Sequence, residues 1–209
     1  MSFGFQLFDE NGGLALDDKS FSIVGRDMVL GGKGSFPLYP EFIALGVSGA
    51  QLVGKGIIWE INGNSVVYEV LDGKTLTAVV FDDSSKSVAY PVMGLEIFNE
   101  SGLKTFSSGD RHFEIISASS TRGGTGGAHR EPLDRGVIYI LHSVFWYVIG
   151  LFAVGAGVNG AVLGMDYLAA TSTTLALGQR ETWRIPVNNW AEHAPNPQYS
   201  SQIIRVRAK

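Results

Sequence analysis

Two glycine-rich stretches are the residues of this chain that come nearest to a phosphate-binding loop. Gly73-Lys74-Thr75 has the residue order that ends such a loop, in which backbone amides and a lysine bind phosphate oxygens. The loop also needs a glycine five residues before Gly73, where Tyr68 stands, and a following helix, where residues 76–80 have the pattern of a strand. Gly31-Gly32-Lys33-Gly34 fails for similar reasons. We therefore interpret Gly73-Lys74-Thr75 as part of a hairpin turn.

Residues that could carry out acid–base, nucleophilic or metal chemistry lack the spacing that this chemistry needs. Of the four histidines, His112, His129, His142 and His193, no two stand three or four positions apart. Adjacent carboxylates, as at positions 82–83, point to opposite faces of a strand. No Gly-x-Ser-x-Gly nucleophile elbow occurs. We therefore expect no enzyme, no metal site and no cofactor, and we expect His142, in an apolar run, to be a hydrogen-bonded interior residue.

Arginine, glycine and aromatic residues remain as candidates for binding. The glycine-rich residues 123–127 lie between Arg122 and Arg130, where they could bind an anion or become ordered against a neighbouring subunit, and we favour the subunit. Exposed aromatic side chains in the polar segment 188–199 could stack on sugars or pack on a protein. The candidate contact residues for an interface or a ligand are Arg122, Arg130, Trp146, Phe152, Trp190, His193 and Tyr199.

The elements that must position these residues are repeated along the chain. Residues 4–12, GFQLFDENG, align without a gap with residues 94–102, GLEIFNESG. After a slip of two residues, Phe21-Ser22-Ile23-Val24 aligns with Phe113-Glu114-Ile115-Ile116. A repeat of about ninety residues exceeds the ~20–50 of solenoid and propeller units. It indicates a duplicated domain, with a first module over 1–90 and a second over 91–209.

Turn dipeptides predict short strands. Asn62-Gly63 and Asp72-Gly73 separate the apolar stretches 57–61, 66–71 and 76–81. Both dipeptides adopt the left-handed backbone angles of tight hairpin turns, so we expect an antiparallel meander.

Each module is also expected to begin with a hairpin, and no long run with helical period occurs. The hairpins are predicted over 3–16 and 95–106. The expected fold is all-β, with two tandem related β-sandwich-like or small-barrel modules and hairpin or meander connections.

An uncharged segment runs from Gly136 to Met165. A membrane-spanning helix needs ~20 apolar residues, so a membrane-interacting segment over 137–163 is one alternative. His142 and Ser143 interrupt the apolar run, and β-branched and aromatic residues dominate it. Paired buried strands, or strands at an oligomer interface, explain residues 137–165 equally well, and we favour the strands.

Composition limits the classes of protein and partner. Hydrophobic residues make up 45% of the 209 residues, which is enough for a core. A net charge of −4 is too small to indicate nucleic acid binding. The chain has no cysteine, and its first residues have no basic and apolar signal pattern, so we expect synthesis and folding in a cytoplasm.

The second repeat opening, GLEIFNESG followed by Lys104-Thr105-Phe106, resembles the opening of small β-proteins encoded in the tail modules of tailed bacteriophages. The resemblance covers two stretches of roughly twenty-five residues and includes no catalytic signature. It implies a structural virion protein of the tail, at the tip or as a minor component, assembled in the host cytoplasm. It implies other tail proteins and further copies of the chain as partners, and contact of the tip with the host envelope. No functional residues are carried over.

Two alternatives stay open beside tail assembly. One is a receptor- or carbohydrate-binding module that uses the aromatic residues and the loops near 123–130 and 188–199. The other is the membrane-interacting protein that acts through residues 137–163.

Overall fold

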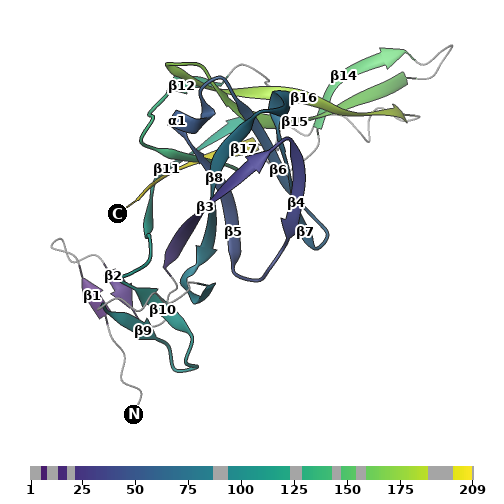
Figure 1. The fold of residues 1–209 in the computed structure, drawn as a ribbon. Helices are drawn as coiled ribbons and strands as arrows, with labels where there is room; N and C mark the ends of the chain where they lie inside the picture. Colours follow the sequence, from purple (N-terminus) through teal and green to yellow (C-terminus); the bar gives the residue numbers. More distant parts are fainter. Residues whose placement is uncertain are drawn as a thin grey trace.

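The protein is a β-sandwich, which confirms the predicted all-β class. The computed structural model describes residues 6–8, 14–17, 22–86, 94–122, 129–142, 147–153, 159–187 and 200–208. Two antiparallel sheets pack face to face, and two small hairpins lie outside them (Figure 1). Over the described ranges neither sheet closes into a barrel, so the structure supports the sandwich rather than the small barrel.

Sheet I has six strands in the order β11-β17-β13-β5-β8-β3. Their bounds are β3 (Ile23–Gly31), β5 (Phe42–Ser48), β8 (Thr75–Asp83), β11 (Phe113–Arg122), β13 (Ile138–His142) and β17 (Ser200–Ala208). The strands β3 and β11 are therefore the two edges of this sheet. The starts of these two edge strands lie close to each other, as the isolated antiparallel bridge between Val24 and His112 shows.

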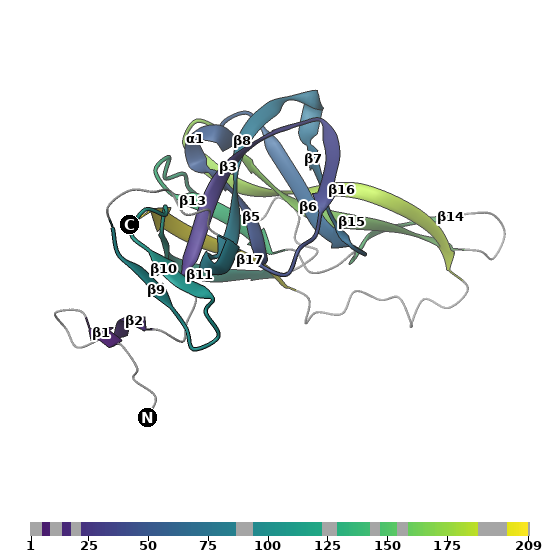
Figure 2. The same ribbon diagram turned by 60° about the horizontal axis from the view of Figure 1, so that its bottom comes forward.

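Sheet II has the order β12-β16-β15-β6-β7-β4, and β14 pairs with β15 beside this path. Figures 1 and 2 show β14 and the ends of β15 and β16 projecting beyond the sandwich. The bounds are β4 (Lys33–Pro37), β6 (Gly56–Asn62), β7 (Ser65–Val70), β12 (Arg130–Pro132), β14 (Tyr147–Ala153), β15 (Asn159–Ala170) and β16 (Thr174–Val187). Short helical turns are α1 (Gly49–Leu52), η1 (Leu71–Gly73) and η2 (Ser84–Lys86).

Each half of the chain contributes three strands to each sheet in matching order, and the second half adds β14 to sheet II. Residues 22–86 supply β3-β8-β5 to sheet I and β4-β7-β6 to sheet II, and residues 94–208 supply β11-β17-β13 and β12-β16-β15. The halves join edge to edge through the pairs β5–β13 and β6–β15. At the first of these seams Gly46, Val47 and Ser48 pair antiparallel with Ile140, Tyr139 and Ile138. The halves are thus related by a local two-fold axis, and the predicted boundary at 88–92 lies outside the described residues.

The two predicted hairpins are confirmed and share one register. In the first, β1 (Gln6–Phe8) pairs with β2 (Leu14–Asp17), and in the second, β9 (Glu96–Phe98) pairs with β10 (Lys104–Ser107). Every paired residue of the first hairpin has its counterpart 90 positions later in the second, and both have an irregularity at the same step, where Ala15 and Thr105 are left out of the register. The sequence repeat is therefore a repeat of backbone geometry.

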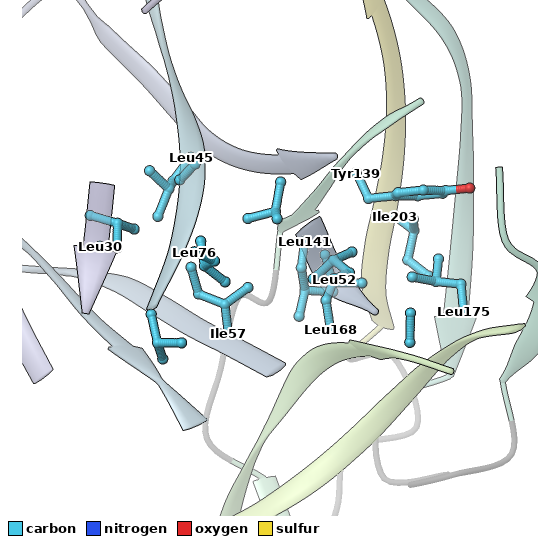
Figure 3. Close-up of a cluster of buried hydrophobic side chains, with 14 of the residues drawn as sticks. Leu30, Leu45, Leu52, Ile57, Leu76, Tyr139, Leu141, Leu168, Leu175 and Ile203 are labelled. Carbon is cyan, nitrogen blue, oxygen red and sulfur yellow. The ribbon is translucent and has the colours of Figure 1, made fainter. Parts of the chain in front are cut away.

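Sheet I is buried on both faces near its centre. Leu45 and Tyr139 point toward sheet II into a cluster that also contains Leu168 and Leu175 (Figure 3). Residues at the alternate positions of the same strands form a second cluster on the other face: Ala44, Val79, Phe81, Phe113, Ile138, Ile140 and Val206. Successive residues of a strand face opposite sides of the sheet. The sequence of a central strand that is buried on both sides is therefore one continuous apolar run.

Residues 137–141 of the uncharged segment belong to this core, and they form a strand in place of a helix. Val137 and the residues Ile138–Leu141 of β13 are buried between β5 and β17. His142 ends the strand exposed, so the interior position predicted for it is wrong. Over the part of the chain that the structure describes, every helix is too short to cross a membrane.

The predicted meander is half correct. β6 and β7 pair across the turn at Asn62-Gly63, where Gly63 has φ 58°. β8, however, pairs with β3 and β5 in sheet I rather than with β7 in sheet II. Asp72 and Gly73, with φ of 61° and 64°, form the turn η1, in which the chain passes from one sheet to the other. The Asp-Gly pair indicated the left-handed turn but not which sheet would receive the next strand.

Candidate interaction surface

A buried carboxylate anchors one polar cluster at the edge of the sandwich. Asp82 on β8 accepts a hydrogen bond from the Tyr39 hydroxyl at 2.5 Å and from Arg26 Nε on β3 at 3.2 Å. Arg26 Nη2 also donates to the Tyr39 oxygen at 2.7 Å. Because Asp82 is paired with a charged and a neutral donor, its burial leaves no uncompensated charge. The cluster ties the loop after β4 to sheet I.

The phenol of Tyr39 should be the clearest spectroscopic reporter of this cluster. Burial, followed by its hydrogen bond to Asp82, raises the pKa of Tyr39 to about 12. A raised pKa favours the neutral phenol in the folded state, so this stabilisation is present below pH ~10 and is lost as the pH rises toward 12. We expect the difference in alkaline phenolate absorbance between wild type and Tyr39→Phe to titrate near 12. A difference curve centred near 10 would contradict the cluster.

A second polar cluster occupies the matching place in the other half. Arg205 on β17 donates to both carboxylate oxygens of Glu131 on β12, at 3.0 Å from Nε and through Nη2. It also donates to Ser117 and Ser119 of β11, each at 3.2 Å. His129 Nε2 lies 3.2 Å from Glu131. Arg205 therefore links both edge strands at this end, β12 of sheet II and β11 of sheet I.

The two clusters use equivalent strands with opposite charges. Asp82 lies on β8 and Arg205 on β17, which hold the same place in the strand order of the two halves. Each side chain points toward sheet II and reaches a partner on, or just after, the first strand of that sheet in its own half. We interpret both clusters as connections between layers. Their charges are matched within the fold, which leaves them little capacity for acid–base work.

A third group of charged residues lies within sheet II, around Glu69. Glu69 on β7 pairs with Arg180 on β16 and, at 3.4 Å, with Lys33 on β4. Burial by itself would raise the pKa of Glu69, but its contacts with Arg180 and Lys33 outweigh burial and lower the pKa.

A buried hydrogen bond connects the two sheets. The hydroxyl of Ser201 on β17 donates to the buried carboxylate of Asp166 on β15 at 2.6 Å.

The second hairpin is docked on the start of β3. The Thr105 carbonyl accepts hydrogen bonds from Ser22 N at 3.1 Å and from Ser84 Oγ at 2.5 Å. Thr105 and Ser84 are fully buried at this contact. Phe106 stacks on His112 with ring centroids 4.5 Å apart, next to the bridge between His112 and Val24. The backbone residue left out of the hairpin register is therefore the residue that fastens the hairpin to the sandwich.

Large apolar side chains are exposed on this hairpin and on the edge strand that follows it. Leu95, Phe98 and Leu103 are half exposed on the hairpin, and Ile115 and Ile116 are 57% and 43% exposed on β11. We call these five residues the apolar edge. β11 has neither lysine nor proline, the residues that commonly protect a free strand edge from pairing. A strand edge without such protection that carries exposed apolar side chains can pair with another chain.

The structure describes the side chain of one of the predicted contact residues, Arg130. Arg130 is exposed on β12, at one edge of sheet II. Only the backbone is described for Arg122, at the end of β11, and for Phe152, in β14. The remaining candidates, Trp146, Trp190, His193 and Tyr199, lie outside the described residues.

The apolar edge was missed from the sequence, although a signal for it exists. Ile115 and Ile116 are adjacent, and successive strand residues face opposite sides, so one of them had to face outward unless a second layer covered it.

Among the described residues, no three histidine, aspartate or glutamate side chains are grouped closely enough to hold a metal ion. Comparison of the chain with protein-family models, with curated proteins and with solved structures finds no match.

Proposed function

We propose that this protein is a structural component of a bacteriophage tail, at the tip or as a minor tail protein, and that it acts by assembling with further copies of itself and with other tail proteins. The observation that carries the proposal is the apolar edge, formed by a repeated hairpin and the edge strand after it. The hairpin is also the segment whose sequence resembles phage tail proteins. Assembly covers such edges and apolar side chains, which would otherwise promote uncontrolled association.

The architecture supports assembly in a second way. Two related halves already join edge to edge through β5–β13 and β6–β15. Strand edges are thus the surfaces through which these modules associate within the chain. The edge strands β4, β11 and β12 offer the same kind of surface to other chains.

Light scattering on the purified protein tests the proposal. We expect a discrete oligomer for the wild type and a lower mass for the double variant Ile115→Lys/Ile116→Lys, because two charges would be buried without partners in the contact. The matched control is Val29→Lys on β3, the opposite edge of the same sheet, where Val29 is 72% exposed and the mass should not change. A wild type that stays monomeric at all concentrations would overturn the proposal.

A further inference from the structure

The two halves differ in how far one aligned pair of apolar residues is buried. Ile23 and Val24 at the start of β3 align with Ile115 and Ile116 at the start of β11. Val24 is 7% exposed and Ile23 packs against the second core cluster, whereas their counterparts are 57% and 43% exposed. The aligned apolar pair is therefore covered in one half and uncovered in the other, where Ile116 is the residue left out of the pairing between β11 and β17.

The cover over the first half is the second hairpin with the residues after it. Thr105 binds Ser22, and Arg111 and His112 lie along β3, where Gly25 N donates to the Arg111 carbonyl at 3.2 Å. The two-fold relation calls for an equivalent cover over the start of β11. The first hairpin, β1–β2, has the required form, because its register and its irregularity repeat those of β9–β10.

The connection after the first hairpin is two residues shorter. Between Ser107 and Phe113 the chain makes a turn in which Asp110 N donates to the Ser107 carbonyl at 3.1 Å, and this turn folds the second hairpin back. The matching stretch from Asp17 to Phe21 has three intervening residues instead of five. Short connections oppose folding back and favour exchange of the element with a neighbouring chain. Figure 2 shows β1 and β2 standing apart from the sandwich of their own chain.

We propose that the first hairpin of one copy, through its strands β1 and β2, docks over Glu114–Ile116 of a second copy, in the manner in which the second hairpin docks over Ser22–Val24 of its own chain. This exchange rests on the proposed function and names its contact. Each chain then offers one hairpin and one acceptor strand, so copies join head to tail or as a reciprocal pair. The contact buries Ile115 and Ile116, which the isolated chain leaves exposed.

Thiol cross-linking tests this contact cleanly, because the chain has no cysteine. Ala15→Cys and Glu114→Cys are prepared as separate variants with different tags, mixed, and oxidised with copper phenanthroline so that cysteines in contact form a disulfide. We expect cross-linked heterodimers in at least tenfold excess over those formed by Ala15→Cys with Ile61→Cys, an exposed position on β6 of the other sheet. The pair Ser22→Cys/Thr105→Cys in one chain is the reference and should cross-link within monomers.

Three other results would overturn the exchange. Cross-linking of an Ala15→Cys/Glu114→Cys chain only within itself would mean that the first hairpin folds back. Absence of the cross-link in a protein that light scattering shows to be oligomeric would refute the exchange and leave the proposed function standing. Absence of the cross-link in a monomeric protein would refute both.

Lengthening the connection provides an independent measurement. Inserting Ser-Gly between Asp17 and Asp18 gives the first connection the length of the second. We expect the oligomer to dissociate, because the hairpin can then reach the acceptor strand of its own chain. The same insertion between Glu100 and Ser101, at the tip of the second hairpin, should leave the mass unchanged. An unchanged mass with the first insertion would contradict the hinge argument.

Discussion

Gly49→Ala should destabilise the protein by about 3 kcal/mol, because it forces a methyl group into the seam between the two halves. Gly49 directly follows β5 and donates to the Val137 carbonyl at 2.9 Å. A Cβ at this position would overlap the Asp134 carbonyl oxygen and lie 3.1 Å from Arg135 Cα. These are backbone atoms, so relief requires the strands β5 and β13 to separate. Urea unfolding measured by circular dichroism gives the free energy directly.

The matched control is Gly136→Ala, in the turn that faces Gly49. Its added Cβ would have Asp134 Oδ1 as its nearest neighbour, at an ordinary 3.5 Å. We expect its free energy of unfolding to stay within about 0.5 kcal/mol of the wild type. Equal losses in the two variants would mean that the seam is not packed as described.

Arg205→Leu should cost about 3 kcal/mol, since it leaves Glu131 without its main cation. Arg205 makes hydrogen bonds to Glu131, Ser117 and Ser119, and so connects three strands. The side chains of Arg205 and Glu131 are 19% and 17% exposed, so solvent replaces the lost contacts poorly. The loss is measured as the free energy of unfolding in urea.

A double-mutant cycle separates the ion pair from packing. The variant Arg205→Leu/Glu131→Leu removes both charges and should recover at least half of the loss, because no unpaired carboxylate remains. Arg207→Leu, at an exposed position of the same strand, should have an effect within about 0.5 kcal/mol. A double variant less stable than the sum of its single variants would rule out a paired role for the two charges.

Features that depend on neighbouring residues in the chain could be predicted from the sequence. Glycine with asparagine, aspartate or serine marks the tips of the predicted hairpins, because these residues tolerate left-handed backbone angles. The uncharged run 137–141 became a central strand because a strand buried on both faces has no polar side. The placement of β8 and of His142 could not be read in this way. Sheet membership and burial depend on which layers lie above and below a strand, and these layers come from distant residues.

The sequence by itself determined the all-β class, the two opening hairpins and the duplication, since these depend on turn chemistry, alternation and internal similarity. Only the tertiary structure decided that the halves join edge to edge about a two-fold axis and that Asp82 and Arg205, of opposite charge, lie on equivalent strands. It also decided that the aligned apolar pairs Ile23-Val24 and Ile115-Ile116 differ in burial. The reason is that pairing between strands far apart in the chain leaves no mark in either strand alone. An Ile-Val or Ile-Ile pair is the same whether a neighbour covers it or not.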